Sequence, residues 1–514
     1  RERNFLRLFI AALVRRPERE LIRRFRGCAE QRATGAQQRM VGEARRRFAV
    51  ETRGVARERV QTGIMNRRAQ DGGVPGRGVR AGLAFTLQQH DIRAMLAREA
   101  PRRSGTSDAA TDYHDLLPRH RSRILGAVLI AIPFLCLGLS AQADPYRIPL
   151  EGEDAQPAVV FDQAALDAKM AEIMPRLVEM RGWKFHEPVA AGIQSTEDFM
   201  LFAAASAEEE YGPEGSAGMM TSAILFGLIP DGQDLDAAVN ALLSASVGGY
   251  YDPKTRKFWL MKGFAVGPLA DILMAHELQH ALDDQQYPLD ALMKVKGNSD
   301  RVFAVRSVVE GSATSAMNLY MLRAVEGNWI PPGELFSANM IGEQMKAMNV
   351  APVAFVASLM LPYLEGNLFL VRGGSLLEAF AKLPSDADLR RAFEQPPLSS
   401  EQILHPEKYW DVQLRDDPLR VEVADHSVVL GAGWRAVDED TLGEFGCAFL
   451  AAPRLPTPLE LQFGAVGLRT PAAAGWGGDR YRSYLHESGA RVAQGIFLWD
   501  TEEDAIEFEV ALAQ

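Results

Sequence analysis

Two histidines stand four residues apart in the segment AHELQHALDDQ, residues 275–285. On a helix, His276 and His280 would lie on adjacent turns of one face, so both imidazoles could present a lone pair to the same Zn²⁺ ion. Glu277 would lie beside that face, where a carboxylate can accept a proton from water. Chance produces HExxH in roughly one chain in a hundred of this kind. The spacing therefore predicts a zinc site that hydrolyses a bond.

A third ligand is required, because a catalytic zinc ion keeps three protein ligands and one open position. Glu310 is the candidate, in the segment SVVEGSATSAM that follows the motif. The small residues at 311–313 should let its helix approach the helix of the histidines closely. The alternative is an ion pair between Arg306 and Glu310, one helical turn apart.

Four further side chains are candidates for supporting roles. Asp284 lies four residues after His280 and would either orient that histidine by a hydrogen bond or end the helix as an exposed acid. His405, Tyr409 and Arg480 are candidates for stabilising an oxyanion, and a structural hydrogen bond accounts for each of them equally well.

The elements that must position these residues are two helices and a hairpin. Apolar periodicity predicts that the helix bearing the motif runs from about Gly267 to Gln286 and is largely buried. A second helix is expected over Arg301–Arg323. Residues 248–261 are typical of a hairpin, because aromatic and β-branched residues flank a turn at Asp252-Pro253.

The charge of the chain divides it into two parts. Residues 1–123 carry 28 arginines, no lysine and 13 acidic residues, whereas the remainder carries 28 basic and 54 acidic residues. At the junction, a basic stretch ends at Arg123, an apolar run covers 124–139, and Ala-Gln-Ala follows at 141–143. This pattern is typical of a secretory signal peptide cleaved after Ala143, and the apolar run is short for the alternative, a retained membrane anchor.

A signal peptide at 119–143 makes residues 1–118 an Arg-rich extension that we expect to be absent from the mature protein. A nucleic-acid-binding arm is the weaker interpretation, because aromatic residues are few and no binding motif is present. The mature protein would be exported to the periplasm or the medium without a permanent membrane span. Of Cys28, Cys136 and Cys447, only the last would remain, which excludes an intramolecular disulfide.

The whole chain is 47% hydrophobic, and its exported part is long enough to form a large core. We expect helices near 195–211, 216–228 and 234–246, and buried helices rather than a membrane span in the apolar stretch 351–371, which contains two prolines, a glutamate and an asparagine. Strands are expected at LRVEV (419–423) and ARVAQGIFLW (490–499), before a terminal helix. The expected divisions are a mostly helical region at 144–247, a catalytic core at 248–410 and an α+β lobe at 411–514.

The HExxH motif with a helix-borne glutamate downstream resembles the gluzincins, the clan of zinc metallopeptidases that includes thermolysin. The segments GGYYDP, HELQHALDDQ, VEGSAT, PPLSSEQILHPEKY and AAAGWGGDRY resemble those of an exported bacterial metallopeptidase family of this clan, over most of 150–514. One departure is Thr314, which stands where thermolysin has an aspartate that follows its glutamate ligand. The partner that orients a ligand histidine must therefore differ here.

The resemblance implies an α+β fold with a helix-rich, zincin-like catalytic core and one Zn²⁺ per chain. It also implies hydrolysis of a protein or peptide substrate with Glu277 as the general base, and a strand near Phe258–Leu260 whose edge receives the extended substrate. The alternative is a catalytically silent zincin-fold module that binds a partner in the cell envelope. The intact Glu277 favours the enzyme, because a silent site does not require that residue.

Overall fold

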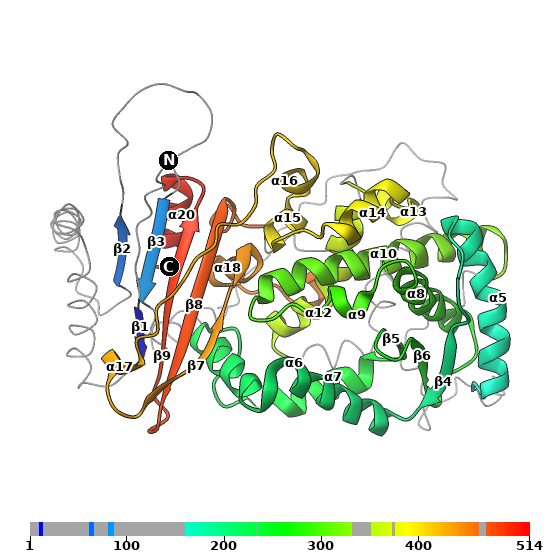
Figure 1. Ribbon diagram of the computed structural model, residues 1–514, viewed down its shortest axis with the longest axis horizontal. Helices are drawn as coiled ribbons and strands as arrows, with labels where there is room; N and C mark the ends of the chain where they lie inside the picture. Colours follow the sequence, from blue (N-terminus) through cyan, green and yellow to red (C-terminus); the bar gives the residue numbers. More distant parts are fainter. Residues whose placement is uncertain are drawn as a thin grey trace, which may run out of the picture.

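Figure 1 shows a computed structural model of the protein, which has the predicted α+β fold. The structure describes residues 160–233, 235–330, 351–372, 376–461 and 469–513, and three short strands nearer the N-terminus. The predicted signal peptide at 119–143, with its cleavage site, lies outside the described residues.

Three long helices form the centre of the fold: α8 (Pro268–Asp284), α10 (Ser299–Glu326) and α12 (Val353–Leu370). A proline at the first position starts α8, where its missing N–H costs no hydrogen bond, and the Asn298 side chain caps α10 by accepting from the N–H of Arg301. Both α8 and α10 begin and end within three residues of the prediction. All residues of α8 from Ala270 to Asp284 are buried, as expected.

Helix α12 corresponds to the long apolar stretch of the sequence. Among the described residues it alone is long and apolar enough to cross a membrane, judged by length and composition. In the structure it is one helix that packs along α10, and its Glu365 and Asn367 are each only 1% exposed. The stretch is therefore a buried helix, as expected.

Two glycines allow α10 and α12 to touch backbone to backbone. A Cβ added at Gly366 of α12 would lie 1.8 Å from the carbonyl oxygen of Ser307, and one added at Gly311 of α10 would lie 2.3 Å from the carbonyl carbon of Gly366. We expected the small residues at 311–313 to bring α10 close to α8. That expectation is wrong for Gly311, which makes its close approach to α12.

A small sheet lies beside α8, with the order β4 (Ala190–Gln194), β6 (Lys257–Met261), β5 (Gly249–Asp252). β5 and β6 form the predicted hairpin, and β6 also pairs in parallel with β4. β6 is therefore the middle strand, so the prediction that Phe258–Leu260 offers an edge to substrate is wrong. The strand at the edge next to α8 is β5.

The region before the hairpin is helical, as expected. It contains α5 (Gln163–Arg181), α6 (Thr196–Leu225) and α7 (Leu235–Ser246). The two helices predicted at 195–211 and 216–228 are one helix, because α6 continues through the Gly-Pro step at 212–213. The packing of α6 against the C-terminal sheet outweighs the low helix propensity of that step. At one contact, Ser222 Oγ donates to Ser483 Oγ at 2.8 Å.

The C-terminal lobe is built on the antiparallel strands β7 (Trp434–Asp440), β8 (Trp476–His486) and β9 (Arg491–Trp499), at one end of the molecule in Figure 1. The helices α18 (Gly443–Ala451) and α20 (Glu502–Leu512) pack on it. The strand predicted at 419–423 is absent. This segment runs beside β8 with one bond of the ladder type, from Leu419 N to Gly477 O.

The short helices connect these parts: α9 (Leu289–Leu292), α13 (Leu376–Ala381), α14 (Asp386–Glu394), α15 (Ser400–Leu404), α16 (Glu407–Trp410), α17 (Ser427–Leu430) and α19 (Pro458–Leu461). The remaining strands are β1 (Ile10–Leu13), β2 (Gln61–Met65) and β3 (Ala81–Thr86). β1 and β3 pair with β9, and β2 pairs with β3. We expected residues 1–118 to be absent from the mature protein, and this structure of the whole chain does not test that prediction. Here β1 and β3 occupy the edge of β9 opposite β8.

Candidate metal centre

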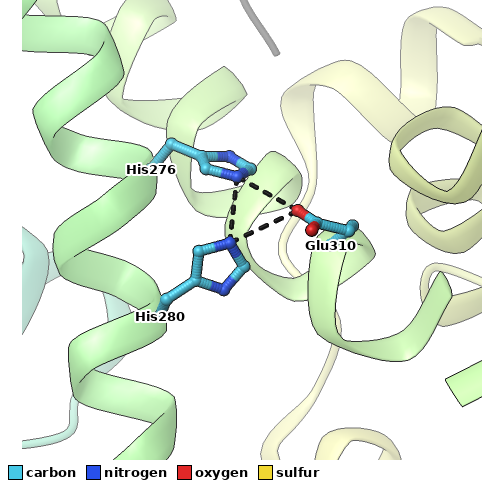
Figure 2. Close-up of side chains that lie close together, drawn as sticks. All are labelled: His276, His280 and Glu310. Atoms are coloured by element: carbon cyan, nitrogen blue, oxygen red, sulfur yellow. Dashed lines mark hydrogen bonds and ion pairs between the residues drawn. The ribbon is translucent and has the colours of Figure 1, made fainter. Parts of the chain in front are cut away.

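The side chains of His276, His280 and Glu310 meet between α8 and α10 (Figure 2). The Nε2 atoms of the two histidines are 3.1 Å apart. Glu310 Oε2 lies 3.3 Å from the Nε2 atom of each. The predicted spacing of four residues thus places both imidazoles on one face of α8, and α10 brings the predicted third carboxylate to them. This contact favours a ligand role for Glu310 over an ion pair with Arg306.

The three donor atoms fit a zinc ion. Ligands at 2.0–2.1 Å in tetrahedral directions are about 3.3 Å from one another. The observed separations of 3.1, 3.3 and 3.3 Å match that value. Two imidazole nitrogens and one carboxylate oxygen are also a donor set that catalytic zinc sites use. These residues could therefore hold one metal ion between the two helices.

Charge and burial shift the pKa values of this cluster in opposite directions. Burial alone would raise the pKa of Glu310, but the neighbouring histidines outweigh it and hold that pKa well below its usual range. Burial alone would lower the pKa of His280, but the Glu310 carboxylate raises it to about 9. Without a metal ion, the centre therefore favours a carboxylate beside a protonated imidazole. A divalent cation would replace that proton.

Glu277 is held beside the cluster by the edge strand. Its Oε2 accepts a hydrogen bond of 2.9 Å from the backbone N–H of Tyr251 in β5. Burial raises the pKa of Glu277, against the effect of the two histidines. The carboxylate is 8% exposed and is fixed without being one of the three converging donors. A carboxylate near a metal site that is not itself a ligand could accept a proton from a water molecule there.

Asp284 does neither of the things expected of it. Its Oδ2 accepts from the hydroxyl of Tyr251 at 2.9 Å, and its Oδ1 accepts from the N–H of Leu289 at 2.8 Å. It is 4% exposed, so it is not a solvated acid at a helix end. It ties β5 to the end of α8 and does not contact His280. The Nδ1 atoms of His276 and His280 are buried and have no hydrogen-bond partner among the described residues.

One residue of this neighbourhood was missed by the sequence analysis. The ring of Tyr363, in α12, faces the ring of His276 with 5.4 Å between centroids and 21° between planes. Only the packing of α12 against α10 brings it there. A single tyrosine in an apolar segment gives no spacing signal that could have identified it.

A buried polar cluster was also missed, on the side of α8 that faces α5. Arg181 Nη2 donates to Ser312 Oγ at 2.9 Å, and Gln279 Nε2 donates to Asp283 Oδ1 at 2.7 Å. Burial lowers the pKa of Arg181, and the nearby Asp283 opposes that effect. Since Ser312 lies two residues after Glu310, this cluster links α5 to both helices of the centre.

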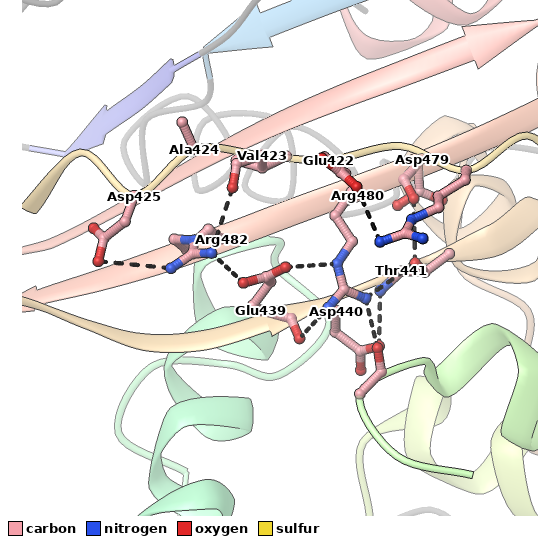
Figure 3. A network of polar contacts seen from close by, with 12 residues as sticks. Glu422, Val423, Ala424, Asp425, Glu439, Asp440, Thr441, Asp479, Arg480 and Arg482 are labelled. Atoms are coloured by element: carbon pink, nitrogen blue, oxygen red, sulfur yellow. Dashed lines mark hydrogen bonds and ion pairs between the residues drawn. The ribbon is translucent and has the colours of Figure 1, made fainter.

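The three candidates for oxyanion stabilisation lie elsewhere. Tyr409 is fully buried, and its hydroxyl donates to the carbonyl oxygen of Gln395 at 2.8 Å. His405 lies 2.9 Å from the carboxylate of Glu444. Arg480 pairs with Glu439 (Figure 3). None of the three contacts the histidines or Glu310. Each makes a structural contact instead, which is the alternative that the sequence left open.

The GWGGDRY segment joins the lobe to the start of α10. Arg480 donates to the carbonyl oxygen of Gly297 at 2.5 Å, just before α10. The Asp479 carboxylate accepts from the N–H groups of Leu442 and Gly443 at 2.9 and 2.8 Å, and so caps α18. Through these contacts, the GWGGDRY segment joins the C-terminal lobe to the central helices.

A second group of carboxylates surrounds a cation of the protein itself. Glu401, Asp416 and Asp500 lie close enough together to hold a metal ion. The ammonium group of Lys408 lies among them, at 2.5 Å from Glu401, 3.5 Å from Asp416 and 3.1 Å from Asp500. This group is therefore an ion-pair cluster with its own cation.

Comparison with known proteins adds one finding outside the metal centre. Residues 427–514 match the family model of a domain of unknown function, DUF8575. The match falls within the predicted C-terminal lobe and spans β7, β8, β9 and the helices packed on them. Neither the curated proteins nor the solved structures compared with this chain give a match.

Proposed function

We propose that this protein is an exported, zinc-dependent metallopeptidase of the gluzincin type. The observation that carries the proposal is the convergence of the Nε2 atoms of His276 and His280 with a carboxylate oxygen of Glu310. Two helices separated by a loop present these atoms at the separations that one zinc ion requires. The resemblance of the surrounding segments to a gluzincin family supports the same assignment.

The roles of the residues follow from their positions. His276, His280 and Glu310 would hold the ion, which supplies Lewis-acid activation of a water molecule and of the scissile carbonyl group. Glu277 takes the proton from the attacking water and delivers it to the leaving amine. The hydrogen bond from Tyr251 N keeps the Glu277 carboxylate in place for both transfers. The substrate class is an extended protein or peptide segment.

The alternative is a silent module that binds zinc and a partner of the cell envelope. Such a module needs the three ligands but gains nothing from a carboxylate fixed next to them. The position of Glu277, buried and bonded to β5, supports the enzyme. Export, by the predicted signal peptide to the periplasm or the medium, is part of the same proposal.

The test combines metal analysis with a proteolysis assay on the purified protein. We expect one zinc per chain and cleavage of unstructured protein substrates. Glu277→Gln should retain the zinc and lose about 10²- to 10⁴-fold in turnover, the usual contribution of a general base. Glu310→Gln should lose zinc, while Glu326→Gln, an exposed position of the same helix, serves as the matched control.

The outcomes separate the two functions. Stoichiometric zinc with no turnover by the wild-type protein on any unstructured substrate would favour the silent module. A wild-type protein that binds no zinc would refute both.

A further inference from the structure

No described residue gives the two proposed ligand histidines the outer hydrogen bond that usually fixes such a ring. A histidine that binds a metal ion through one nitrogen commonly donates from the other to a carboxylate, a carbonyl or a water molecule, and this bond sets the orientation of the ring. Here the Nδ1 atoms of both His276 and His280 are buried without a partner among the described residues. Among the described residues, the contacts that can hold the imidazole planes are those between rings.

Tyr363 occupies the place where it can hold the first ring. Its ring lies against the face of the His276 ring, at 5.4 Å and 21°. The ring of His280 meets that of His276 edge to face, at 4.7 Å and 89°. Tyr363 therefore lies on a face of the His276 ring, and His280 meets that ring at a right angle, so both neighbours restrict the rotation of His276.

The position of Tyr363 is set by the contact between helices. Gly366 follows it by three residues, on the same side of α12, and touches the backbone of α10 at Ser307. Gly311, directly after Glu310, forms the other half of this contact. The crossing that places Glu310 therefore also places Tyr363 over His276.

We propose that Tyr363 is a positioning residue that orients the metal ligand His276 by ring stacking. This inference rests on the proposed function, because it assumes that the centre binds zinc. The proposal assigns this role to the aromatic ring. An aromatic ring without the hydroxyl group should therefore replace tyrosine, whereas a side chain without a ring should not.

The experiment measures the affinity of the full-length protein for Zn²⁺ by competition with a chromophoric chelator at constant pH. Tyr363→Phe should bind zinc within about twofold of the wild-type protein. Tyr363→Leu and Tyr363→Met should bind roughly 10-fold more weakly, at the lower end of the effect of losing an outer partner. Two variants without a ring are used so that the folding failure of one leaves the other to decide.

A matched control removes a stacked tyrosine away from the centre. Tyr287 is half-buried like Tyr363, and its ring stacks on Phe393 at 4.6 Å and 3°. Tyr287→Leu should leave the zinc affinity unchanged. The visible absorption of Co²⁺ bound in place of zinc gives a second readout, because it reports the ligand geometry. Tyr363→Phe should keep the wild-type spectrum, and Tyr363→Leu should change it.

Two results would overturn the inference. Wild-type affinity in both aliphatic variants would show that the stack orients nothing, and equal losses in the Phe and Leu variants would assign the effect to the hydroxyl group. These failures differ from failure of the proposed function, in which the wild-type protein itself binds no zinc.

Discussion

Replacing Gly366 by alanine should destabilise the protein through the contact between α10 and α12. The added Cβ would lie 1.8 Å from the carbonyl oxygen of Ser307, whereas an ordinary contact needs at least 3.4 Å. The obstacle is backbone, which cannot rotate away, so the helices must separate by more than about 1 Å. Overpacking of this kind lowers the free energy of unfolding by up to about 3 kcal/mol, and the higher helix propensity of alanine offsets about 1 kcal/mol of that loss. We expect a net loss of about 2 kcal/mol in the free energy of unfolding.

Gly311→Ala tests the same contact from the other helix. Its Cβ would meet the backbone of Gly366 at 2.3 Å. Once one alanine has pushed the helices apart, the second finds the space already open. The double variant should therefore lose less than the sum of the two single losses, because sites in direct contact are not additive.

Urea unfolding followed by far-ultraviolet circular dichroism measures all four proteins, in the presence of a chelator so that zinc binding does not contribute. A Gly366→Ala variant as stable as the wild-type protein or more stable, as helix propensity alone would predict, would contradict a steric clash at this contact. Losses of the two single variants that simply add would contradict a contact shared by the two glycines.

Three further predictions concern the centre and the lobe. Zinc at 100 times its dissociation constant should stabilise the wild-type protein by about 2.7 kcal/mol, measured by thermal unfolding with and without chelator, and His280→Ala should show no such difference. Burial raises the pKa of Asp300 and of Asp479 from 3.8 to about 7, so the folded state binds these protons more tightly. These two protons stabilise the folded state fully below about pH 4, and that stabilisation is lost as the pH rises through 7. The free energy of unfolding, measured by thermal unfolding between pH 5 and 8, should therefore fall as the pH rises. An unchanged pH dependence in Asp300→Asn would contradict this prediction. Tyr251→Phe removes the hydrogen bond to Asp284 and should cost about 1–2 kcal/mol in urea unfolding, and a variant as stable as the wild-type protein would show that this bond contributes nothing.

The residues of the candidate centre could be found from the sequence because their signals are local. A spacing of four fixes two histidines on one helix face whatever the rest of the chain does. Glu310 could be identified because it lies among small and apolar residues on the next long helix, where a carboxylate is unusual unless a cation lies near it. Asp284 was misjudged because the same spacing places it near His280 without showing that Tyr251 and Leu289 reach it first.

The remaining contacts of the centre depend on packing between distant segments. Tyr363 is near His276 only because α12 crosses α10 at two glycines, and no periodicity within 351–371 indicates that crossing. The same limit applies to Arg181, which is 131 residues from its partner Ser312.

The fold shows the same division between local and long-range signals. Strong apolar periodicity predicted α8 and α10, and the turn at Asp252-Pro253 predicted the β5–β6 hairpin. The break expected within α6 followed from local propensity, which the packing of that helix overrides. The alternating pattern of 419–423 fits a strand, but the segment finds only one backbone bond to β8. Pairing partners, which a single segment cannot specify, decide such cases.

We propose above all that His276, His280 and Glu310 together bind one zinc ion. Diffraction data from zinc-grown crystals, collected on both sides of the zinc absorption edge, locate the ion directly. We predict one anomalous peak about 2.0–2.1 Å from the Nε2 atoms of both histidines and from the Glu310 carboxylate. Fully occupied zinc elsewhere in the protein, with no peak between these three side chains, would contradict the claim.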